Sequence, residues 1–450
     1  MDAKKVKANP TKTFFVEMIT RDISVEDCIL DLIDNSVDGA WALAGSHPMH
    51  LDQGADLTPY TVSITADGEH FTVTDNCGGM SLDDAIERAF SFGRRPDDGH
   101  DEFSIGVYGI GMKRAVFKLG RDVSIRSTHT NGARQESFEV AIDVDDWMAD
   151  ETLPWDFDLN PAKPLDADGV QISVKRLTPG SSSALASPAF IQNLRRTISR
   201  DYALHLAQGL NIYINGICVK GWEIELLDSE EISPLRLAYT ENVNGIDVRV
   251  EIVGGMAAPP PENSDPDTQA DGEKRFGWYV ACNGRIVLAA DKSETAGWGT
   301  DGWPQWHRQY AGFVGLIHFS SENAIALPLT TTKRNVDVSS EVYRRARPKM
   351  REIAKSWIAY TNVRKQALDD AKLKESQARP VALSKIEQRS AITLPVLTPK
   401  TKELTANIAY SMPISRVRDL ANGFGNINMS YREVGLRSFD YAFSDFVSGQ

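Results

Sequence analysis

The positions of apolar residues divide this chain of 450 residues into alternating helical and extended segments. Residues 10–45 have the 3.6-residue period of two helices, joined near Arg21-Asp22. Alternating runs predict strands at 61–65, 71–74, 122–128, 136–142 and 170–176, and helices are predicted at 82–92 and 111–119. This order predicts a mixed α/β sandwich, followed at 178–183 by a Pro- and Ser-containing stretch that we interpret as a linker.

A second α/β unit is predicted after this stretch. A helix at 188–206 precedes strands near 210–215, 222–226, 246–253, 276–282 and 313–319. The proline-rich acidic segment 257–272 is predicted to be a loop, and Asn283-Gly284 is typical of a type I′ hairpin turn. A helical pattern continues from Val338 to about Gln377, and two short helices end the chain. We therefore expect domains at 1–178, 184–340 and 341–450.

Polar residues repeat on one face of the second predicted helix, in the stretch CILDLIDNSVDGA. Asp31, Asn35 and Asp38 are spaced i, i+4 and i+7 and fall within about 60° of one another on a helix. An amide oxygen such as that of Asn35 is a suitable Mg²⁺ ligand, and a carboxylate four residues earlier can polarise a water molecule. For this segment alone, a solvated helix face is the alternative.

Two glycine-rich stretches follow. The strand at 71–74 runs into Asp75-Asn76-Cys77-Gly78-Gly79-Met80, where an aspartate can accept a hydrogen bond from a base and glycines allow close backbone approach. Gly106-Val107-Tyr108-Gly109-Ile110-Gly111-Met112-Lys113 leads into the helix at 111–119, which favours phosphate binding, with Lys113 as a point charge. A Rossmann or Walker loop is the competing interpretation, but the G-x-x-x-x-G-K-[ST] pattern is missing.

Taken in order, the three segments resemble the GHKL superfamily of ATPases (gyrase, Hsp90, histidine kinase, MutL), with the MORC-like and MutL-like branch closest. Residues 31–40 resemble its first box, residues 75–80 the second and residues 106–113 the third. The resemblance implies an α+β fold. A GHKL (Bergerat) ATP-binding α/β sandwich would be followed by an S5-like transducer domain and a basic helical C-terminal tail.

The resemblance also implies roles for individual residues. The ligands would be ATP and Mg²⁺, with Asp31 as general base, Asn35 as the Mg²⁺ ligand and Asp75 bound to the adenine amino group. The other residues implied to contact the nucleotide are Asp38, Gly79, Met80, Gly106, Val107, Tyr108, Gly109, Ile110, Gly111, Met112 and Lys113. Residues 89–103 would form a lid over the nucleotide.

A lysine far along the chain has the context of a residue that reaches the ATP site. The segment FGWYVACNGRIVLAADKSETAGWG resembles the strand-turn-strand of a transducer domain. ALPLTTTKRN resembles the transducer loop that sends a lysine, here Lys333, to the γ-phosphate, where a cation stabilises the transition state. The threonines before Lys333 can turn the loop through side-chain hydrogen bonds. An exposed loop lysine is the alternative, and Arg334 is the second candidate.

Three positions depart from the pattern of these families. Asp31 stands where Glu is usual and is one methylene shorter, which predicts slow turnover and leaves open a pseudo-ATPase that binds ATP without hydrolysing it. Cys77 stands where the second box usually has its first glycine. In the closing strand Gly169-Val170 replaces the usual Gly-Thr, so Val170 offers no hydroxyl on the adenine side.

Charge and composition narrow the function classes. The net charge is −13, yet residues 341–450 hold 19 Lys and Arg against 11 Asp and Glu, so we expect a basic tail that could contact DNA. Four scattered cysteines indicate a reducing compartment, and no apolar run is long enough to span a membrane. These features predict a cytoplasmic protein.

We therefore predict an ATPase that acts as a homodimeric clamp or switch, in which ATP drives closure and dimerisation. The client would be DNA, in DNA maintenance or in defence against foreign DNA. An Hsp90-like chaperone with protein clients is the alternative. A histidine kinase is disfavoured because the residues before the first box contain no histidine, and a topoisomerase is disfavoured because no room remains for a cleavage domain.

Overall fold

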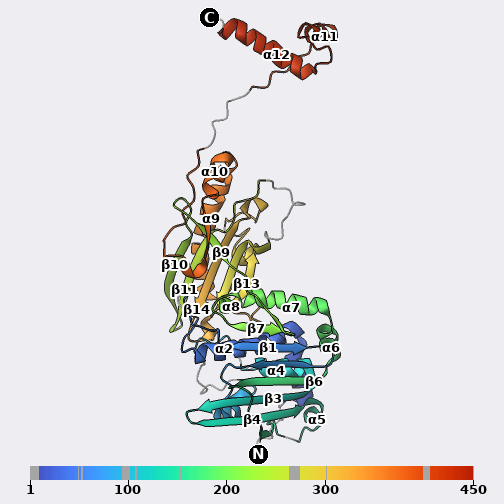
Figure 1. Ribbon diagram of the computed structural model, residues 1–450, viewed down its shortest axis with the longest axis vertical. Coiled ribbons are helices and arrows are strands. Elements are labelled where there is room, and N and C mark those ends of the chain that lie inside the picture. The colour runs from blue at the N-terminus through green and yellow to red at the C-terminus, as the bar shows by residue number, and fades with distance from the viewer. Residues whose placement is uncertain are drawn as a thin grey trace, which may run out of the picture. The chain divides into compact units, whose positions relative to one another are not determined.

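The computed structural model describes residues 10–48, 50–51, 54–93, 102–106, 109–152, 154–262, 274–300, 302–398 and 406–448. The chain divides into two compact units, Met1–Pro399 and Lys400–Gln450. The described residues of the larger unit form two large sheets and one two-stranded sheet, and Figure 1 shows the helices and strands of both units.

An eight-stranded sheet organises the first part of the larger unit, in the order β5-β4-β3-β6-β2-β1-β7-β8 (Figure 1). Its strands are β1 (Thr61–Ala66), β2 (Phe71–Asp75), β3 (Gly120–Asn131), β4 (Arg134–Asp143), β5 (Leu159–Pro161), β6 (Gly169–Leu177), β7 (Asn211–Ile214) and β8 (Ile217–Cys218). Neighbouring strands are antiparallel apart from β1 and β7, which are parallel.

Alternation along the strands gives this sheet one apolar face. Val123 and Ile125 of β3 are buried in the core with the helices, whereas Asp122 and Ser124 line a polar groove, as a period of two requires. The helices of this part are α1 (Lys12–Arg21), α2 (Val25–Leu43), α3 (Leu82–Asp84), the π-helix η1 (Ala85–Ala89), α4 (Gly111–Leu119), α5 (Val144–Ala149), α6 (Pro179–Leu185), α7 (Pro188–Asp201) and α8 (Ala203–Ala207).

Two segments of this part differ from the prediction. Residues 178–183 are not a linker but begin α6, because the Thr178 side chain caps the helix by accepting from the Ser181 N–H and Pro179 takes the first helical position. The strand expected near 210–215 in the second unit is β7, which pairs with β1. Ile212 and Ile214 are fully buried in the first core, so the first sheet extends past residue 178.

A five-stranded sheet organises the second part of the larger unit, in the order β10-β11-β14-β12-β13. Its strands are β10 (Leu235–Val243), β11 (Ile246–Met256), β12 (Gly277–Cys282), β13 (Arg285–Asp291) and β14 (Phe313–Ser320), and β9 (Glu225–Asp228) pairs separately with β15 (Arg379–Ala382). The remaining elements are η4 (Glu294–Ala296), η5 (Arg308–Tyr310), η6 (Ala324–Ala326), α9 (Glu341–Arg364), α10 (Leu368–Glu375) and η7 (Leu383–Lys385). Of the predicted acidic loop, residues 263–272 lie outside the described residues.

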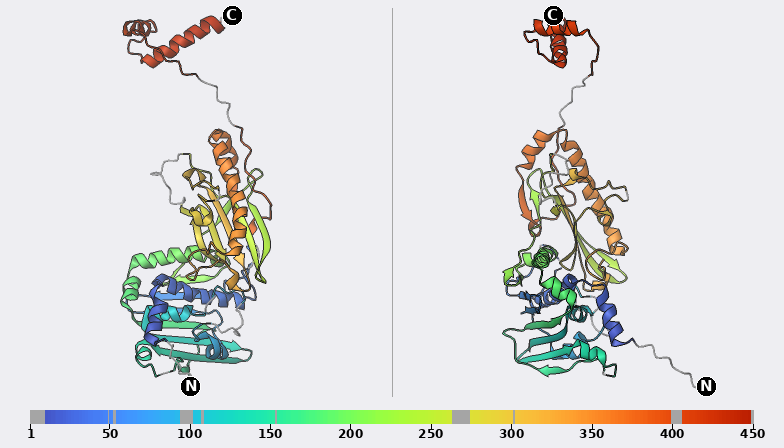
Figure 2. Two further views of the ribbon diagram at one scale, coloured as in Figure 1. Left: turned by 180° about the vertical axis from the view of Figure 1, so that it is seen from behind. Right: turned by 90° about the vertical axis from the view of Figure 1, so that its right-hand side faces the viewer.

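Helix α9 runs along the five-stranded sheet in both views of Figure 2. Met350, Ile353 and Trp357 are buried there, and Trp357 Nε1 donates to the Tyr310 carbonyl at 2.9 Å. The prediction placed residues 341–450 in one helical tail. Helix α9 instead belongs to the core of the second sheet, because its apolar stripe faces inward.

The smaller unit contains α11 (Ile414–Gly423) and α12 (Tyr431–Phe443), which η8 (Ser444–Ser448) continues. A small cluster of Ala421, Met429 and Val434 forms its core. Residues 406–450 hold four arginines and four acidic residues, so the basic excess of the predicted tail lies before residue 406. In the described part of the chain, no helix has both the length and the apolar character needed to cross a bilayer.

Among the described residues of the larger unit, two histidines are buried. His205 of α8 accepts at Nδ1 from Trp41 Nε1 at 2.9 Å, and His318 of β14 accepts at Nε2 from the Gly284 N–H at 2.9 Å. Each ring is therefore neutral, with its proton on the other nitrogen. Burial lowers the pKa of His205 to about 4 and the pKa of His318 to about 3.

We expect the free energy of unfolding to fall as the pH drops from about 6.5 towards 4. The pKa of His205 is lower in the folded chain than the ordinary 6.5, so the unfolded chain binds a proton that the folded chain does not. His205 alone corresponds to a loss of about 3 kcal/mol. Denaturant unfolding at several pH values, followed by tryptophan fluorescence, measures the fall.

The variant His205→Gln should show a smaller fall in the free energy of unfolding than wild type. His70→Gln, at an exposed site, is the control and should match wild type. Equal falls in all three proteins would contradict the assignment to His205.

Candidate functional site

A cavity of about 620 Å³ brings the three glycine- and acid-containing segments together, and its volume is typical of small-molecule sites. Its lining includes Asp31, Asn35, Ser36, Asp38 and Gly39 of α2, Val73 and Asp75 of β2, Gly79, Met80, Gly106, Gly109, Ile110, Gly111, Met112, Lys113, Arg114, Val170, Thr331 and Lys333. Among the predicted site residues, Val107 and Tyr108 lie outside the described residues, as do residues 94–101 of the predicted lid.

Helix α2 presents one polar face to this cavity. The helix begins at Ser24, whose side chain caps it by accepting from the Asp27 N–H at 3.0 Å. Residues 28–34 are buried but Asn35 is exposed, so its amide oxygen is accessible to a ligand. Asp38 accepts from the Ile105 N–H at 3.2 and 3.1 Å and thereby positions the segment that leads to Gly106.

Asp75 is a buried carboxylate held by three donors. Its Oδ1 accepts from the N–H groups of Cys77 and Val170 at 2.9 and 3.2 Å, and its Oδ2 accepts from Ser36 Oγ at 2.7 Å. Burial raises the pKa of Asp75, although these hydrogen bonds oppose the rise. Each carboxylate oxygen has two lone pairs, and Oδ2 uses one of them for Ser36, so Asp75 can still accept through Oδ2 from an amino group in the cavity.

The backbone around Asp75 requires glycine at two positions. Gly79 has a φ of 69°, and a Cβ there would lie 2.1 Å from the Thr128 carbonyl oxygen. A Cβ at Gly169 would lie 2.0 Å from the Asp75 carbonyl oxygen. Beside this close approach, the Val170 N–H donates to Asp75, and the hydroxyl of Ser36 of α2 donates to the other oxygen of the same carboxylate.

The third segment leads into α4. Gly109 has a φ of 64°, and the N-cap residue Ile110 makes no side-chain cap hydrogen bond. The N-cap side chain therefore provides no acceptor for the first turn of α4 at the edge of the cavity, an arrangement that suits an anion. Lys113 is buried, and its Nζ donates to the carbonyls of Ala89, at 2.8 Å, and of Gly109. In this conformation Lys113 contacts backbone at both ends of residues 89–109.

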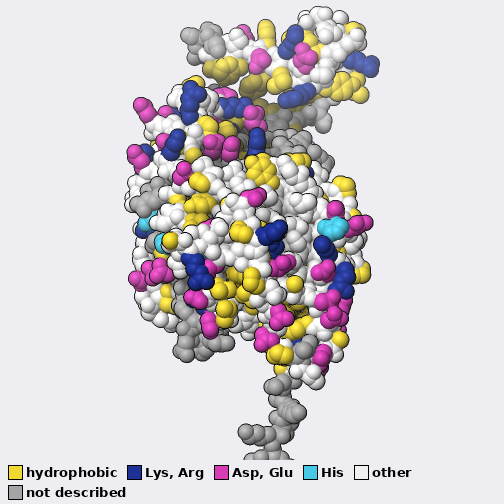
Figure 3. Space-filling view, turned by 60° about the horizontal axis from the view of Figure 1, so that its bottom comes forward, with side chains coloured by type: hydrophobic (Ala, Val, Ile, Leu, Met, Phe, Trp, Pro, Cys, Tyr) yellow, Lys and Arg dark blue, Asp and Glu magenta, His cyan; other side chains and the backbone are white. Residues whose placement is uncertain are grey.

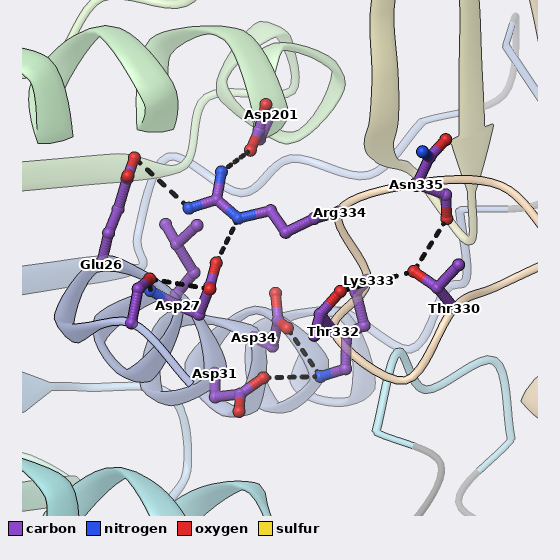
Figure 4. Close-up of polar contacts among 12 residues, drawn as sticks. Glu26, Asp27, Asp31, Asp34, Asp201, Thr330, Thr332, Lys333, Arg334 and Asn335 are labelled. Carbon is purple, nitrogen blue, oxygen red and sulfur yellow. Dashed lines mark hydrogen bonds and ion pairs between the residues drawn. The ribbon is translucent and has the colours of Figure 1, made fainter. Parts of the chain in front are cut away.

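Lys333 reaches this cavity from the second part of the larger unit (Figure 4). Its Nζ lies 3.2 Å from Asp31 Oδ1 and 2.8 Å from Asp34 Oδ2. The loop turns because Thr330 Oγ1 donates to the Asn335 carbonyl at 3.1 Å and the Lys333 N–H donates to the Thr330 carbonyl at 2.9 Å. Lys333 has a φ of 55°, a strained conformation for a non-glycine residue that is found preferentially at functional sites.

Arg334 points away from the cavity, towards the start of α2 (Figure 4). It forms ion pairs with Glu26, Asp27 and Asp201. Of the two basic residues considered from the sequence, Lys333 therefore lines the cavity, and Arg334 joins its loop to α2 and α7.

Asp34 is the central residue that the sequence analysis missed. It is fully buried and accepts from Tyr202 Oη at 2.7 Å, from Lys333 Nζ and from Arg285 of β13. Burial by itself would raise the pKa of Asp34, but Arg285 and Lys333 lower it below its ordinary value. Burial likewise opposes the charge of Lys333, yet Asp34 and Asp31 raise its pKa. A sequence signal did exist, since Asp34 is an acidic residue at the edge of an apolar helix face.

Arg114 is a second residue that the sequence analysis did not single out. Its guanidinium lies 2.5 Å from Asp31 Oδ2, on the side opposite the Lys333 contact to Oδ1. Asp31 is thus held by one cation from α4 and one from the loop of the second part. In the sequence, Arg114 could have been found from its position directly after Lys113 in the same predicted helix.

Residues 23–167 match the model of a family described as histidine kinase-, DNA gyrase B- and HSP90-like ATPase. The matched range contains all three predicted boxes. It supports a GHKL-type ATPase domain for this part of the chain, in agreement with the prediction from the motifs. A comparison with curated proteins finds no match.

We expect Asp34→Asn to lower the free energy of unfolding by about 3 kcal/mol, because the substitution leaves Arg285 and Lys333 buried without their shared counter-charge. Denaturant unfolding of the full chain measures the change. Asp145→Asn is the matched control, since Asp145 forms exposed pairs with Arg121 and Arg176 and its loss should change stability little. Equal stabilities of the two variants would contradict this account of the charge cluster.

Proposed function

We propose that this protein binds Mg²⁺ and ATP in the 620 Å³ cavity and hydrolyses ATP slowly. One observation carries the proposal: the cavity is lined by the polar face of α2, the buried Asp75, the N-terminus of α4 and Lys333 from the second part. Each of these groups suits a different portion of a nucleoside triphosphate. The family match at residues 23–167 supports the same ligand.

The residues present fit this ligand. Asp75 lies where glycines allow close backbone approach and can accept from the adenine amino group. The N-terminus of α4 suits the phosphates. The exposed amide of Asn35 would bind Mg²⁺, which when bound would neutralise phosphate charge. Within the described residues no group of three or more His, Cys, Asp or Glu side chains could hold a metal ion, and Mg²⁺ commonly takes one or two protein ligands together with substrate phosphates.

Asp31 is the group that we propose as general base. In the present conformation Lys333 contacts its Oδ1 and Arg114 contacts its Oδ2. A γ-phosphate carries more negative charge than a carboxylate and would attract Lys333 away from Asp31. Oδ1 would then be able to accept a proton from water, while Arg114 keeps the carboxylate in place. Lys333 would at the same time stabilise charge on the transferred phosphoryl group.

A nucleotide-gated switch without turnover is the second candidate. The observation that favours it is the engagement of both oxygens of Asp31 by cations, on a side chain one methylene shorter than Glu. Such a protein would bind ATP and change conformation through Lys333 without activating water.

We expect wild-type protein to hydrolyse Mg·ATP and Asp31→Asn to lose at least about a hundredfold in kcat while it still binds ATP, because general-base catalysis typically contributes 10²–10⁴-fold. Steady-state phosphate release and equilibrium nucleotide binding measure the two effects. Asp38→Asn serves as the comparison, since Asp38 bonds the loop before Gly106 and its loss should weaken binding. No turnover in wild type, with binding in both proteins, would leave the switch as the function.

We further propose that the second part acts as a transducer of the MORC-like and MutL-like kind and that ATP closes a homodimeric clamp. Helix α1 supports a dimer contact because Phe14 and Met18 are exposed by 57% and 53%. The other face of α1 is anchored, since Lys12 Nζ donates to the Asp150 carbonyl at 2.9 Å and Phe15 packs against Phe92 and Trp155.

DNA is the client that we propose for the clamp. The face drawn in Figure 3 carries acidic and basic side chains interspersed. The basic excess of the chain is instead concentrated at residues 341–405, which hold 15 Lys and Arg against 7 Asp and Glu. Such an excess attracts phosphate backbones without reading sequence. With DNA as its client, the protein would act in DNA maintenance or in defence against foreign DNA.

We expect a non-hydrolysable ATP analogue with Mg²⁺ to shift the protein from monomer to dimer. The mass in solution, measured by light scattering after gel filtration, detects the shift. Phe14→Ser should abolish it because the substitution removes apolar contact area from α1. Ile217→Ser is the control, since Ile217 of β8 is exposed to a similar degree, 53%. An unchanged mass in wild type with bound analogue would exclude the ATP-driven dimer.

A further inference from the structure

The tip of the β12–β13 hairpin carries an asparagine whose side chain is buried. Asn283 and Gly284 have φ angles of 43° and 82°, as the predicted type I′ turn requires. An asparagine in such a turn usually faces solvent, but Asn283 is only 1% exposed. Turn formation alone does not account for this burial.

The Asn283 side chain joins the second part of the larger unit to the nucleotide cavity. Its Nδ2 donates to the Ser104 carbonyl at 3.0 Å and to the Ser321 carbonyl at 3.1 Å. Its Oδ1 accepts from the Ser321 N–H at 3.0 Å. Both amide hydrogens are thus used, and they are used on two different parts of the fold. Only a carboxamide provides this combination of two donors and an acceptor at this position.

Ser104 belongs to a short segment that leads into the third glycine stretch, and both Ser104 and Gly106 line the cavity. The segment is held from two sides. The Phe103 N–H donates to the Glu322 carbonyl of the second part at 3.1 Å, whereas the Ile105 N–H donates to Asp38 of α2. A displacement of Gly106 would therefore strain the contacts both to α2 and to the segment that follows β14.

A second hairpin in the same sheet shows what the turn itself needs. Asn244 and Gly245 join β10 to β11 with φ angles of 53° and 85°, close to those of Asn283 and Gly284. Asn244 is exposed. The contact to Ser104 is therefore a property of the hairpin at Asn283 and not of Asn-Gly turns in general.

We propose that Asn283 is a positioning residue that couples occupancy of the nucleotide cavity to the second part of the protein, separately from Lys333. This inference rests on the proposed binding of ATP. Nucleotide phosphates bound beside Gly106 and Gly111 would fix Ser104, and Asn283 would relay that position to the β12–β13 hairpin and to Ser321. Arg285, two residues further along the same hairpin, bonds Asp34 of α2, so one hairpin contacts both α2 and the segment that leads to Gly106.

Asn283→Asp tests the proposal. Aspartate keeps the size and the left-handed backbone of Asn283 but offers no amide hydrogens to the two carbonyls, which it would repel. Asn244→Asp is the matched control in an exposed turn of the same type. Asn283→Gly is a second variant, which keeps the turn without strain and deletes the side chain if the aspartate disturbs folding.

Two measurements on the full chain decide the outcome. Without nucleotide, we expect faster hydrogen exchange at residues 102–106 in Asn283→Asp than in wild type and Asn244→Asp. With a non-hydrolysable ATP analogue and Mg²⁺, we expect Kd to rise about tenfold. The protection that the analogue produces at residues 277–291 in wild type should be lost in Asn283→Asp and in Asn283→Gly.

The outcomes separate this inference from the proposed function. If wild type and the Asn244→Asp control bind the analogue and Asn283→Asp and Asn283→Gly match them in Kd and in exchange, the relay is wrong and ATP binding stands. If wild type fails to bind the analogue, the proposed function is wrong and the relay falls with it.

Discussion

The arrangement of this protein depends on one buried carboxylate, Asp34, and on the two cations that neutralise it. Arg285 comes from a strand of the second sheet and Lys333 from a loop after it, whereas Asp34 lies in the middle of α2. A charge buried without a partner is far too costly to tolerate. The two parts of the larger unit must therefore pack so that both cations reach Asp34, and few relative placements satisfy this condition.

Such a cluster fixes geometry more than it adds stability. Desolvation of three charged groups offsets much of their mutual attraction, and apolar residues of the same volume often stabilise a fold equally well. What the cluster provides is a defined register between α2 and the second sheet, with Tyr202 of the connecting helices bonded to the same carboxylate. Because Lys333 also contacts Asp31, the structural charge cluster and the proposed catalytic group share one lysine.

That shared lysine relates structure to function. A phosphate ligand of the kind that we propose would compete with Asp31 and Asp34 for Lys333, so its binding would change the balance of charges at the domain contact itself. Helix α2 carries Asp31 and Asp38 on the face that lines the cavity and Asp34 at the edge that faces the second sheet. Coupling between the proposed ligand site and the domain contact needs no long-range pathway, because both lie on the same helix.

The sequence alone determined the local patterns that line the cavity. The i, i+4, i+7 spacing of Asp31, Asn35 and Asp38, the turn after Asp75 and the glycines before Lys113 are local patterns, and their physical reasons are local too. The strands and helices of the first sheet could be predicted for the same reason, since each follows from its own periodicity. One local signal was misinterpreted: Thr178-Pro179 is the cap of α6, whereas the sequence analysis interprets these residues as part of a linker.

Only the tertiary structure decided which distant groups complete the site. Asp34, Arg114 and Arg285 looked like ordinary charged residues, because the need for a counter-charge appears only once burial removes water. The pairing of β7 with β1 moved the domain boundary because burial of Ile212 and Ile214 depends on a sheet built elsewhere in the chain. The Asn283 turn could be read from two residues, but its contact with Ser104 could not, since a local conformation does not specify what the fold brings against it.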